Sequence, residues 1–299
     1  MMKKLFALLA ALLLVCTAGA FAMAEEDDDD PVFSYLPIDF SPGMPLDRSK
    51  FTRDSYVDPS ISVKITTGDE NGVLYWIADV EIDHPSQLRT AAAESFDKKG
   101  TEYGSVLARR MNAVLAVDGD FYCYASNNDV HVTIRQGITF QNSLLPRPCQ
   151  DVLLIDEDGD FHGVEDPRAG DVGTEINGKR IINAFYFGPL LVNNGAIRVK
   201  APSHMGPEQP SQRVAIAQTG RLKYRVIVTG PNRRGSKAFN FDQWRAFVAG
   251  MDDIQVAYNL DGGHSAVLIF NFEKINDPEN RNERPLSDII YFASYWPNV

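Results

Sequence analysis

Short apolar segments separated by turn residues recur along most of this chain, and they constrain its fold more than any other feature. Residues 61–66 alternate apolar and polar side chains, as a half-buried strand does, and residues 73–82 follow after a glycine-containing turn. This pair predicts a β-hairpin. Further strands are expected at residues 113–117, 130–134, 151–155, 181–187, 190–192, 197–199, 213–218, 222–229, 255–260, 266–272 and 287–292.

Helical patterns are fewer than strand patterns. An Ala-rich run after Pro85 predicts a helix at residues 88–96, and a short helix fits residues 105–111. The clearest helix is at residues 241–251, where Asn240 can cap the first turn and Phe241, Trp244 and Phe247 fall on one face. No linker or fixed-period repeat divides the chain. We therefore expect an α+β (mixed α/β) fold, a single strand-rich domain with mixed sheets and a few packed helices over residues 61–299.

The N-terminus has the pattern of a secretory signal peptide. Lys3 and Lys4 precede an apolar run at residues 5–15, and Ala22-Met23-Ala24 fits a cleavage site. The apolar run is shorter than the roughly 20 residues that span a membrane. We expect cleavage after Ala24 and export, followed by an acidic leader and irregular lead-in at residues 25–60. A lipoprotein anchor at Cys16 is the alternative, although the preceding Val is bulky for that type of site.

The formal net charge of −11 argues against nucleic acid or an anionic membrane surface as a partner. The acidic run at residues 25–30 fits a solvated leader, with calcium binding as the alternative. Cys123 and Cys149 follow the signal peptide, and an oxidising compartment would allow but not require a disulfide between them. No sequence feature indicates an oligomeric state.

No motif for a cofactor or catalytic metal is found in the sequence. The chain has no HExxH pattern, no CxxC pair and no phosphate-binding P-loop, and its histidines do not have metal-ligand spacing. We expect no cofactor, with a bound Ca²⁺ in an acidic cluster as the remaining alternative.

Two loops that follow expected strands carry a carboxylate beside glycine: Asp118-Gly119-Asp120 and Asp261-Gly262-Gly263. Glycine allows close approach of a ligand to the backbone, and ligand sites in α/β folds lie at the carboxyl ends of strands. The alternative is an ordinary Asp-Gly turn, which we accept for residues 156–159. The other two loops continue into apolar or aromatic residues, so we consider them candidate functional loops.

Five segments occur in the order and with the residues of a known family: residues 116–122, 187–192, 213–218, 259–265 and 284–288. Together they resemble the phosphodiester glycosidases, over about residues 60–293. The resemblance implies hydrolysis of the glycosidic bond of a sugar 1-phosphodiester, similar to a GlcNAc-1-phosphodiester. For an exported protein it implies a carbohydrate or sugar-phosphate substrate in envelope or extracellular polysaccharide.

The resemblance also assigns roles to residues. Asp261 is the expected essential carboxylate, as nucleophile or base, and Asp120 and Asp118 are candidates for the second carboxylate or for binding sugar hydroxyls. His264 is a candidate proton donor or phosphate contact. The remaining candidates are for substrate binding: Arg213 as the phosphate clamp with Arg284 as its substitute, Gly262 and Gly263 through backbone N–H groups, Phe121 or Tyr122 as a stacking ring, and Gly188, Ser265 and Asp288.

Alternatives remain for several of these residues. The aromatic side chains could serve only as core packing, and Arg284 and Asp288 could form a structural ion pair. The chain also departs from the family's usual residues, which are Asn at Asp118, a small residue at His264, and Pro and Thr on either side of Arg213. These departures keep open a non-catalytic carbohydrate or envelope-binding module. A metal-dependent phosphodiesterase is a third reading that fits the few histidines poorly.

Overall fold

The computed structural model describes residues 34–98, 100–121, 132–143, 151–168, 171–199, 209–231, 237–277 and 282–296. These residues belong to one unit, Phe33–Val299. No helix within them is long and apolar enough to cross a membrane. The expectations for residues 1–33, for Cys123 and Cys149, and for Tyr122 lie outside the described residues.

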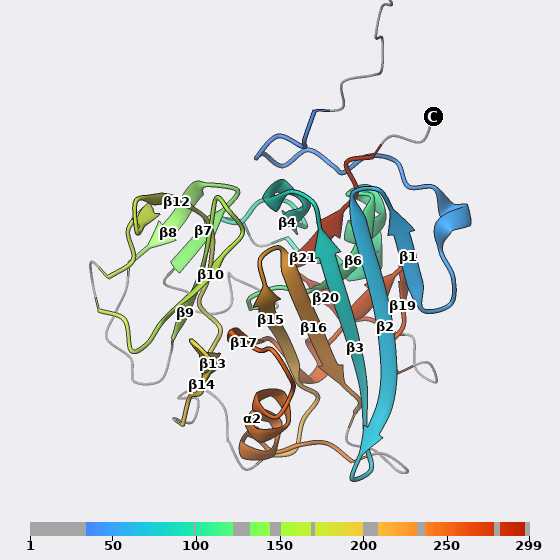
Figure 1. Ribbon diagram of the computed structural model, residues 1–299, viewed down its shortest axis with the longest axis vertical. Helices are drawn as coiled ribbons and strands as arrows, with labels where there is room; N and C mark the ends of the chain where they lie inside the picture. The colour runs from blue at the N-terminus through green and yellow to red at the C-terminus, as the bar shows by residue number, and fades with distance from the viewer. Residues whose placement is uncertain are drawn as a thin grey trace, which may run out of the picture. The chain divides into compact units, whose positions relative to one another are not determined.

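The largest sheet has eight strands in the order β1-β2-β3-β16-β15-β17-β13-β14, and every neighbouring pair is antiparallel (Figure 1). The predicted hairpin of β2 with β3 is confirmed, and the expected strands also pair as hairpins in β13 with β14 and in β15 with β16. The strands are β1 Ser55–Asp58, β2 Ile61–Glu70, β3 Val73–Ile82, β13 Leu190–Asn193, β14 Ala196–Ile197, β15 Val214–Gly220, β16 Lys223–Thr229 and β17 Val256–Leu260.

A five-stranded antiparallel sheet has the order β19-β18-β6-β21-β4. Its strands are β4 Leu88–Ala92, β6 Ala113–Asp118, β18 Leu268–Phe270, β19 Glu273–Lys274 and β21 Asp288–Ala293. The main apolar core lies between this sheet and the eight-stranded sheet, because it contains Val117 and Phe292 of the former together with Val63 and Val214 of the latter. The two sheets therefore pack face to face as a β-sandwich.

A six-stranded antiparallel sheet contains the strands β7 to β12, and a two-stranded pair joins β5 to β20. The six-stranded sheet has its own apolar cluster, which includes Phe121 and Phe187. The strands are β5 Glu102–Tyr103, β7 Val132–Arg135, β8 Ile138–Asn142, β9 Val152–Asp156, β10 Phe161–Val164, β11 Glu175–Ile176, β12 Lys179–Phe185 and β20 Pro285–Leu286. Asp156–Gly159 is a turn between β9 and β10, as expected.

Two α-helices cover the outer faces of the sandwich. Helix α1, Gly104–Arg110, packs on the five-stranded sheet, and α2, Phe241–Ala249, packs on the eight-stranded sheet. Asn240 caps α2 and exchanges two hydrogen bonds with Gln243, so the predicted helix and cap are confirmed. Short 3₁₀ turns are η1 Arg48–Lys50, η2 Pro85–Gln87 and η4 Gly263–Ser265.

Two expectations about the fold need correction. The domain is strand-rich, but it is mostly β rather than mixed α/β, since the strands of the described residues pair antiparallel. The helix predicted at residues 88–96 is wrong, because residues 88–92 form β4 and residues 93–96 are not helical. Its Ala residues suggested a helix, yet β4 pairs along its length with β21 and is buried, and such tertiary context overrides local propensity.

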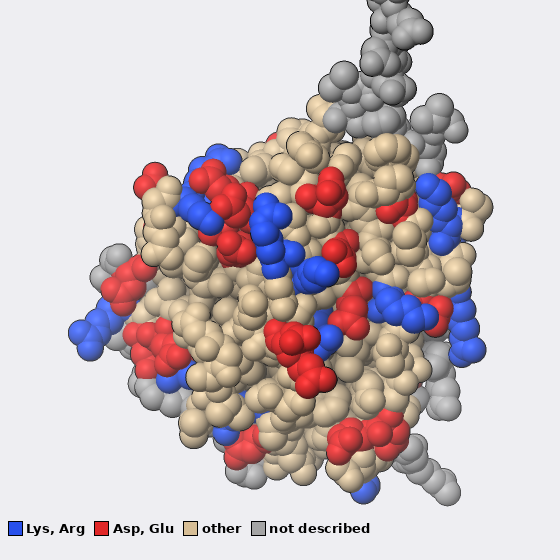
Figure 2. Space-filling model, viewed as in Figure 1, with Lys and Arg blue, Asp and Glu red and all other residues tan. Residues whose placement is uncertain are grey.

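Charged side chains of both signs are interspersed on the face shown in Figure 2. Several basic residues pair with nearby acids, including Lys223 with Glu81 and Arg225 with Asp79. Such exposed pairs contribute little to stability, at about 0–1 kcal/mol each. Among the described residues on this face, basic side chains do not form a continuous patch.

Candidate active site

The loop that follows β17 crosses from one sheet of the sandwich to the other and brings the two candidate loops together. It begins at Asp261, and its later residue Val267 donates its backbone N–H to Oδ1 of Asp118 at 3.0 Å. The negative charge of Asp261 also raises the pKa of Asp118. The two carboxylates thus share one site, although they lie at the ends of antiparallel strands and not along one edge of a parallel sheet.

Asp118 is the more deeply buried of these two carboxylates. It is 1% exposed, and its Oδ2 has no hydrogen-bond partner among the described residues. Burial, followed by the charges of Asp261 and Asp288, holds the pKa of Asp118 well above its usual range. Its environment therefore favours the protonated form, which can donate a hydrogen bond or a proton.

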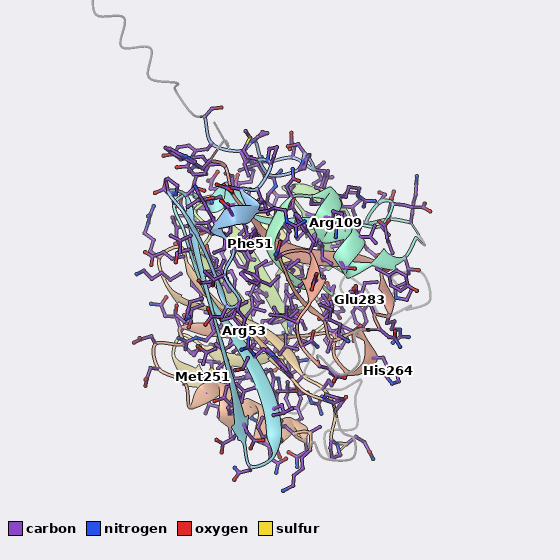
Figure 3. All side chains as sticks on the ribbon, turned by 90° about the vertical axis from the view of Figure 1, so that its right-hand side faces the viewer. Phe51, Arg53, Arg109, Met251, His264 and Glu283 are labelled. Carbon is purple, nitrogen blue, oxygen red and sulfur yellow. The ribbon has the colours of Figure 1, made fainter. Side chains whose placement is uncertain are left out.

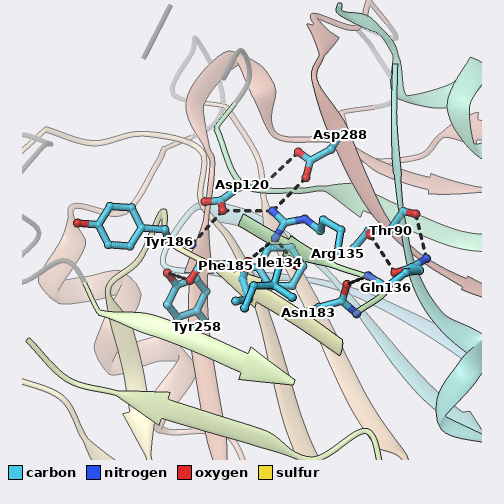
Figure 4. Close-up of polar contacts among 11 residues, drawn as sticks. Thr90, Asp120, Ile134, Arg135, Gln136, Asn183, Phe185, Tyr186, Tyr258 and Asp288 are labelled. Carbon is cyan, nitrogen blue, oxygen red and sulfur yellow. Dashed lines mark hydrogen bonds and ion pairs between the residues drawn. The ribbon is translucent and has the colours of Figure 1, made fainter. Parts of the chain in front are cut away.

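A second pair of carboxylates, Asp120 and Asp288, shares the guanidinium of Arg135 (Figure 4). Nη2 of Arg135 lies 3.3 Å from Oδ2 of Asp120 and 3.3 Å from Oδ2 of Asp288. All three side chains are almost completely buried. Burial raises the pKa of Asp120 to about 7, with the Arg135 charge opposing this rise and the Asp288 charge adding to it. Four aspartates, at 118, 120, 261 and 288, are thus associated at this site.

Arg135 was not predicted from the sequence as a site residue. It ends the apolar strand β7, where a charged side chain is unusual, and this was the one available signal. Its two carboxylate partners lie at very different distances in the sequence: Asp120 is 15 residues away and Asp288 is 153 residues away. Asp288 thus pairs with Arg135. Arg284 is half-buried directly before β20, and its pairing with Asp288 stays a prediction.

Gly119 permits the close approach of these two loops. A Cβ atom at this position would lie 2.4 Å from Oδ1 of Asp288, which is too close for any side chain. The same Oδ1 accepts a hydrogen bond from the backbone N–H of Asp120 at 3.2 Å. The glycine between the two aspartates is therefore a packing requirement of the carboxylate cluster.

Asn259 connects helix α2 to the site. Its Oδ1 accepts from Nε1 of Trp244 at 3.0 Å, and its Nδ2 donates to the carbonyl of Gly188 at 2.9 Å. Gly188 has φ +62° and precedes a cis peptide bond to Pro189. The candidate residue Gly188 is thus fixed beside the strand that leads into Asp261.

Gly262 and Gly263 shape the loop after Asp261. A Cβ atom on Gly262 would lie 2.6 Å from the carbonyl oxygen of Gln212, so this position requires glycine. The N–H of Gly262 donates to Oδ1 of Asp261 at 2.8 Å, and that of Gly263 donates to Gln212 O at 2.9 Å. Both N–H groups, predicted to bind phosphate, already donate to oxygens of the protein.

Arg213 has a buried guanidinium with few polar contacts. Nη2 donates to the carbonyl of Gln209 at 2.9 Å, and the guanidinium carbon lies 5.5 Å from the ring centre of Phe241. Within the described part of the chain, Nε and Nη1 have no hydrogen-bond partner. Burial lowers the pKa of Arg213 to about 10. Such a buried cation is a suitable site for an anion.

His264 and Ser265 follow in the 3₁₀ turn η4 and have different environments. His264 is exposed and lies at the edge of the molecule in the side view of Figure 3. The side chain of Ser265 is buried, and its hydroxyl has no partner in the regions that the structure describes. Phe121 is also buried, with its ring centre 4.9 Å from that of Phe187.

The described residues contain no group of three or more His, Cys, Asp or Glu arranged to hold a metal ion. The acidic turn after β9 illustrates why. Asp156, Asp158 and Asp160 surround the ammonium of Lys179, whose Nζ lies 2.5 Å from Asp158. A protein cation thus occupies the centre of this acidic cluster.

Comparison with known proteins places this geometry in context. The catalytic domain of zebrafish N-acetylglucosamine-1-phosphodiester alpha-N-acetylglucosaminidase, auto-inhibited by its pro-peptide, is similar with a TM-score of 0.61 and 16% identity over 84% of this chain and 87% of that chain. A hypothetical protein from Synechocystis has a TM-score of 0.53 and 15% identity over 80% of this chain and 64% of that one. At these identities, the two likenesses establish a shared fold.

Sequence comparison identifies the family. No curated protein sequence matches the chain. Residues 111–293 match the phosphodiester glycosidase family, and this range includes the aspartates at 118, 120, 261 and 288 as well as Arg135 and Arg213. The matched range covers more than half of the chain, which therefore belongs to the phosphodiester glycosidase family.

Proposed function

We propose that this protein hydrolyses the glycosidic bond of a sugar 1-phosphodiester and releases the free sugar and a phosphomonoester. The observation that carries the proposal is the association of the buried Asp118 with the partly exposed Asp261. Two carboxyl groups in unlike environments are what acid–base chemistry at an anomeric carbon requires. The family supports the reaction class, and the name of the zebrafish enzyme supports GlcNAc as the sugar.

Asp261 is the proposed nucleophile or base. It lies in a glycine-containing loop and is partly exposed, so a substrate can reach it. Its carboxylate would attack the anomeric carbon, activate water, or stabilise the oxocarbenium-like transition state. Asp118, whose burial favours the protonated form, would bind a sugar hydroxyl or supply a proton. A phosphate leaving group needs less protonation than an alcohol, so Asp118 need not be a strong acid.

Arg213 is the proposed phosphate clamp. Its buried guanidinium lacks partners at Nε and Nη1 within the described residues, and a phosphodiester oxygen would satisfy them. Its backbone lies beside the loop after Asp261, since a Cβ atom on Gly262 would be 3.8 Å from Cα of Arg213. His264 and Ser265 are proposed as further contacts to substrate, and Phe121 as a wall of the sugar site.

The proposal includes export and an extracellular substrate. The sequence pattern of residues 1–24 supports a cleaved signal peptide, and no helix in the described ranges is suited to cross a membrane. A sugar 1-phosphodiester in envelope or extracellular polysaccharide is therefore the substrate class we propose.

Product analysis tests the function. We expect the mature protein to release free GlcNAc from a GlcNAc-1-phosphate methyl diester, and Asp261→Asn to lower kcat by at least about a hundredfold, within the range of single catalytic groups. Release of GlcNAc-1-phosphate instead would indicate a phosphodiesterase. Binding of the diester without turnover, unchanged in Asp261→Asn, would indicate a carbohydrate-binding module.

A further inference from the structure

The guanidinium of Arg135 is held in one position from several sides. The side chain is 0% exposed, and Nη1 donates to the carbonyl oxygens of Ile134 and Ala184. The guanidinium carbon lies 4.1 Å from the ring centre of Phe185 and 5.4 Å from that of Phe96. Two rings and two carbonyl oxygens therefore fix the position of the guanidinium independently of its contacts with the carboxylates.

The contacts of Asp120 distinguish its two carboxyl oxygens. Oδ2 accepts from Nη2 of Arg135 at 3.3 Å and from the backbone N–H of Tyr186 at 2.9 Å (Figure 4). Oδ1 has no hydrogen-bond partner in the described ranges of the chain. Arg135 thus binds one oxygen of a buried carboxyl group, and the other oxygen, although buried as well, is not bound by the residues that the structure describes.

Asp288 completes the arrangement. Its Oδ2 lies 3.3 Å from the same Nη2 of Arg135, and its Oδ1 accepts from the backbone N–H of Asp120. One cation therefore stands between two buried carboxyl groups. A single positive charge compensates one carboxylate, so the other group is stabilised by keeping its proton.

We propose that Arg135 is a positioning residue that orients Asp120 and, together with Asp288, sets its protonation, so that Oδ1 of Asp120 can exchange a proton with the substrate. This inference rests on the proposed function, because it concerns the proton chemistry of the same site. It assigns Asp120 a proton-carrying role beside Asp118 and Asp261. It also gives a reason for a buried arginine at the end of β7.

Other groups that face Asp120 are consistent with this role. Asp118 ends β6 two residues before Asp120, Asp288 begins β21, Tyr186 directly follows β12, and Tyr258 lies on β17. Burial is the largest influence on the pKa of Asp120, the Arg135 charge lowers it and the Asp288 charge raises it, and together they hold this pKa at about 7. Burial also raises the pKa of Tyr258 well above its usual value, so this phenol stays neutral.

Two substitutions should therefore move the pH profile in opposite directions. Removing the cation with Arg135→Met should move the alkaline limb of the kcat profile to higher pH, by roughly one unit or more. Removing the second carboxylate with Asp288→Asn should move the same limb to lower pH. A purely structural role would reduce activity through misfolding without producing opposite shifts.

Conservative and control variants complete the design. Arg135→Lys keeps the charge but not the forked geometry, so its alkaline limb should stay near that of the wild type while kcat falls about tenfold or more and KM changes little. Arg89→Lys is the matched control. Arg89 is equally buried, but its contacts are backbone carbonyls, Tyr291 and Asp39 rather than site carboxylates. The variant Arg89→Lys should lower the free energy of unfolding without moving the alkaline limb of the kcat profile.

A carboxyl carbon-13 NMR titration separates the failure of this inference from failure of the proposed function. If the wild type releases no sugar, the proposed function is wrong, and Asp120 then has no catalytic role in it. The titration of Asp120 in Arg135→Met and Asp288→Asn then still decides whether Arg135 sets its protonation. Shifts in opposite directions support the inference. Equal titration in the wild type and both variants, or shifts in the same direction, would overturn it.

Discussion

Asp118 and Asp120 are costly residues for a protein interior, because an ionised carboxylate loses its hydration there. The structure reduces this cost in two ways. Asp118 accepts a backbone N–H while its environment favours the protonated form, and Asp120 shares a guanidinium and a backbone N–H. At the residue scale, the site is thus a set of buried acids whose proton content depends on pH.

The free energy of unfolding should depend on how many of these carboxyl groups are protonated, and therefore on pH. The folded-state pKa of Asp120, about 7, lies above the unfolded value of 3.8, so its contribution to stability is complete below pH 4 and is lost as the pH rises to about 7. In urea unfolding between pH 4.5 and 8, the wild type should lose up to about 1.4 kcal/mol per pH unit relative to Asp120→Asn. Parallel curves for the two proteins would contradict the raised pKa.

Arg213 should affect binding more than stability. Nε and Nη1 of the buried Arg213 have no hydrogen-bond partner among the residues that the structure describes. Such a guanidinium stabilises the fold little, so Arg213→Met should keep the urea midpoint or raise it. The same substitution should weaken inhibition by inorganic phosphate about ten- to hundredfold, as expected for a lost charged hydrogen bond of about 1.5–3 kcal/mol. Arg225→Gln, at a surface pair with Asp79, serves as the control. If phosphate inhibits Arg213→Met as strongly as the wild type, Arg213 does not bind the phosphate of the substrate.

Helix α2 shows how an element outside the site supports it. Its capped N-terminus and one-sided apolar face were predictable from sequence, and both are confirmed. Its link to the site could not be predicted, because it depends on contacts between different elements. The indole of Trp244 on α2 donates to Asn259 on β17, and Asn259 in turn donates to the carbonyl of Gly188. Local spacing indicates a helix face but does not reveal which polar group that face meets.

The link from α2 to the site can be tested by substitution. Trp244→Phe leaves Oδ1 of Asn259 buried without its donor and should cost about 1–3 kcal/mol of stability. It should also lower kcat, since Gly188 loses its fixed neighbour. Asn240→Ala removes the cap at about 1 kcal/mol without touching Asn259, so its kcat should match the wild type. If both variants have wild-type kcat, α2 contributes only packing.

The strands illustrate what sequence can and cannot provide. Alternating patterns correctly placed β2, β3, β15 and β16, because their neighbours in sequence are also their partners in the sheet. In contrast, β4 pairs with β21, almost 200 residues later, and its alanines resembled a helix. The segment could be identified as a strand only from that long-range pairing.

At the scale of the whole molecule, the sandwich brings together motifs that are far apart in the chain. The Asp-Gly pairs at 118 and 261 were identified as candidates from sequence, and the structure unites them through the loop that joins the two sheets. Asp288 was a candidate from family resemblance, while Arg135 was missed. Their pairing brings the end of β7 to the loop after β6 and to the start of β21, which belong to another sheet, and no local pattern records it.

The most direct test of the central claim is the position of bond cleavage. Hydrolysis of a GlcNAc-1-phosphate methyl diester in oxygen-18 water places the label according to the bond that water attacks. A glycosidase of this kind places the label in the released sugar and leaves methyl phosphate unlabelled, and both products are lost in Asp261→Asn. Label in the phosphate product, either in methyl phosphate or in GlcNAc-1-phosphate released together with methanol, would show attack at phosphorus and contradict a glycosidase centred on Asp118 and Asp261.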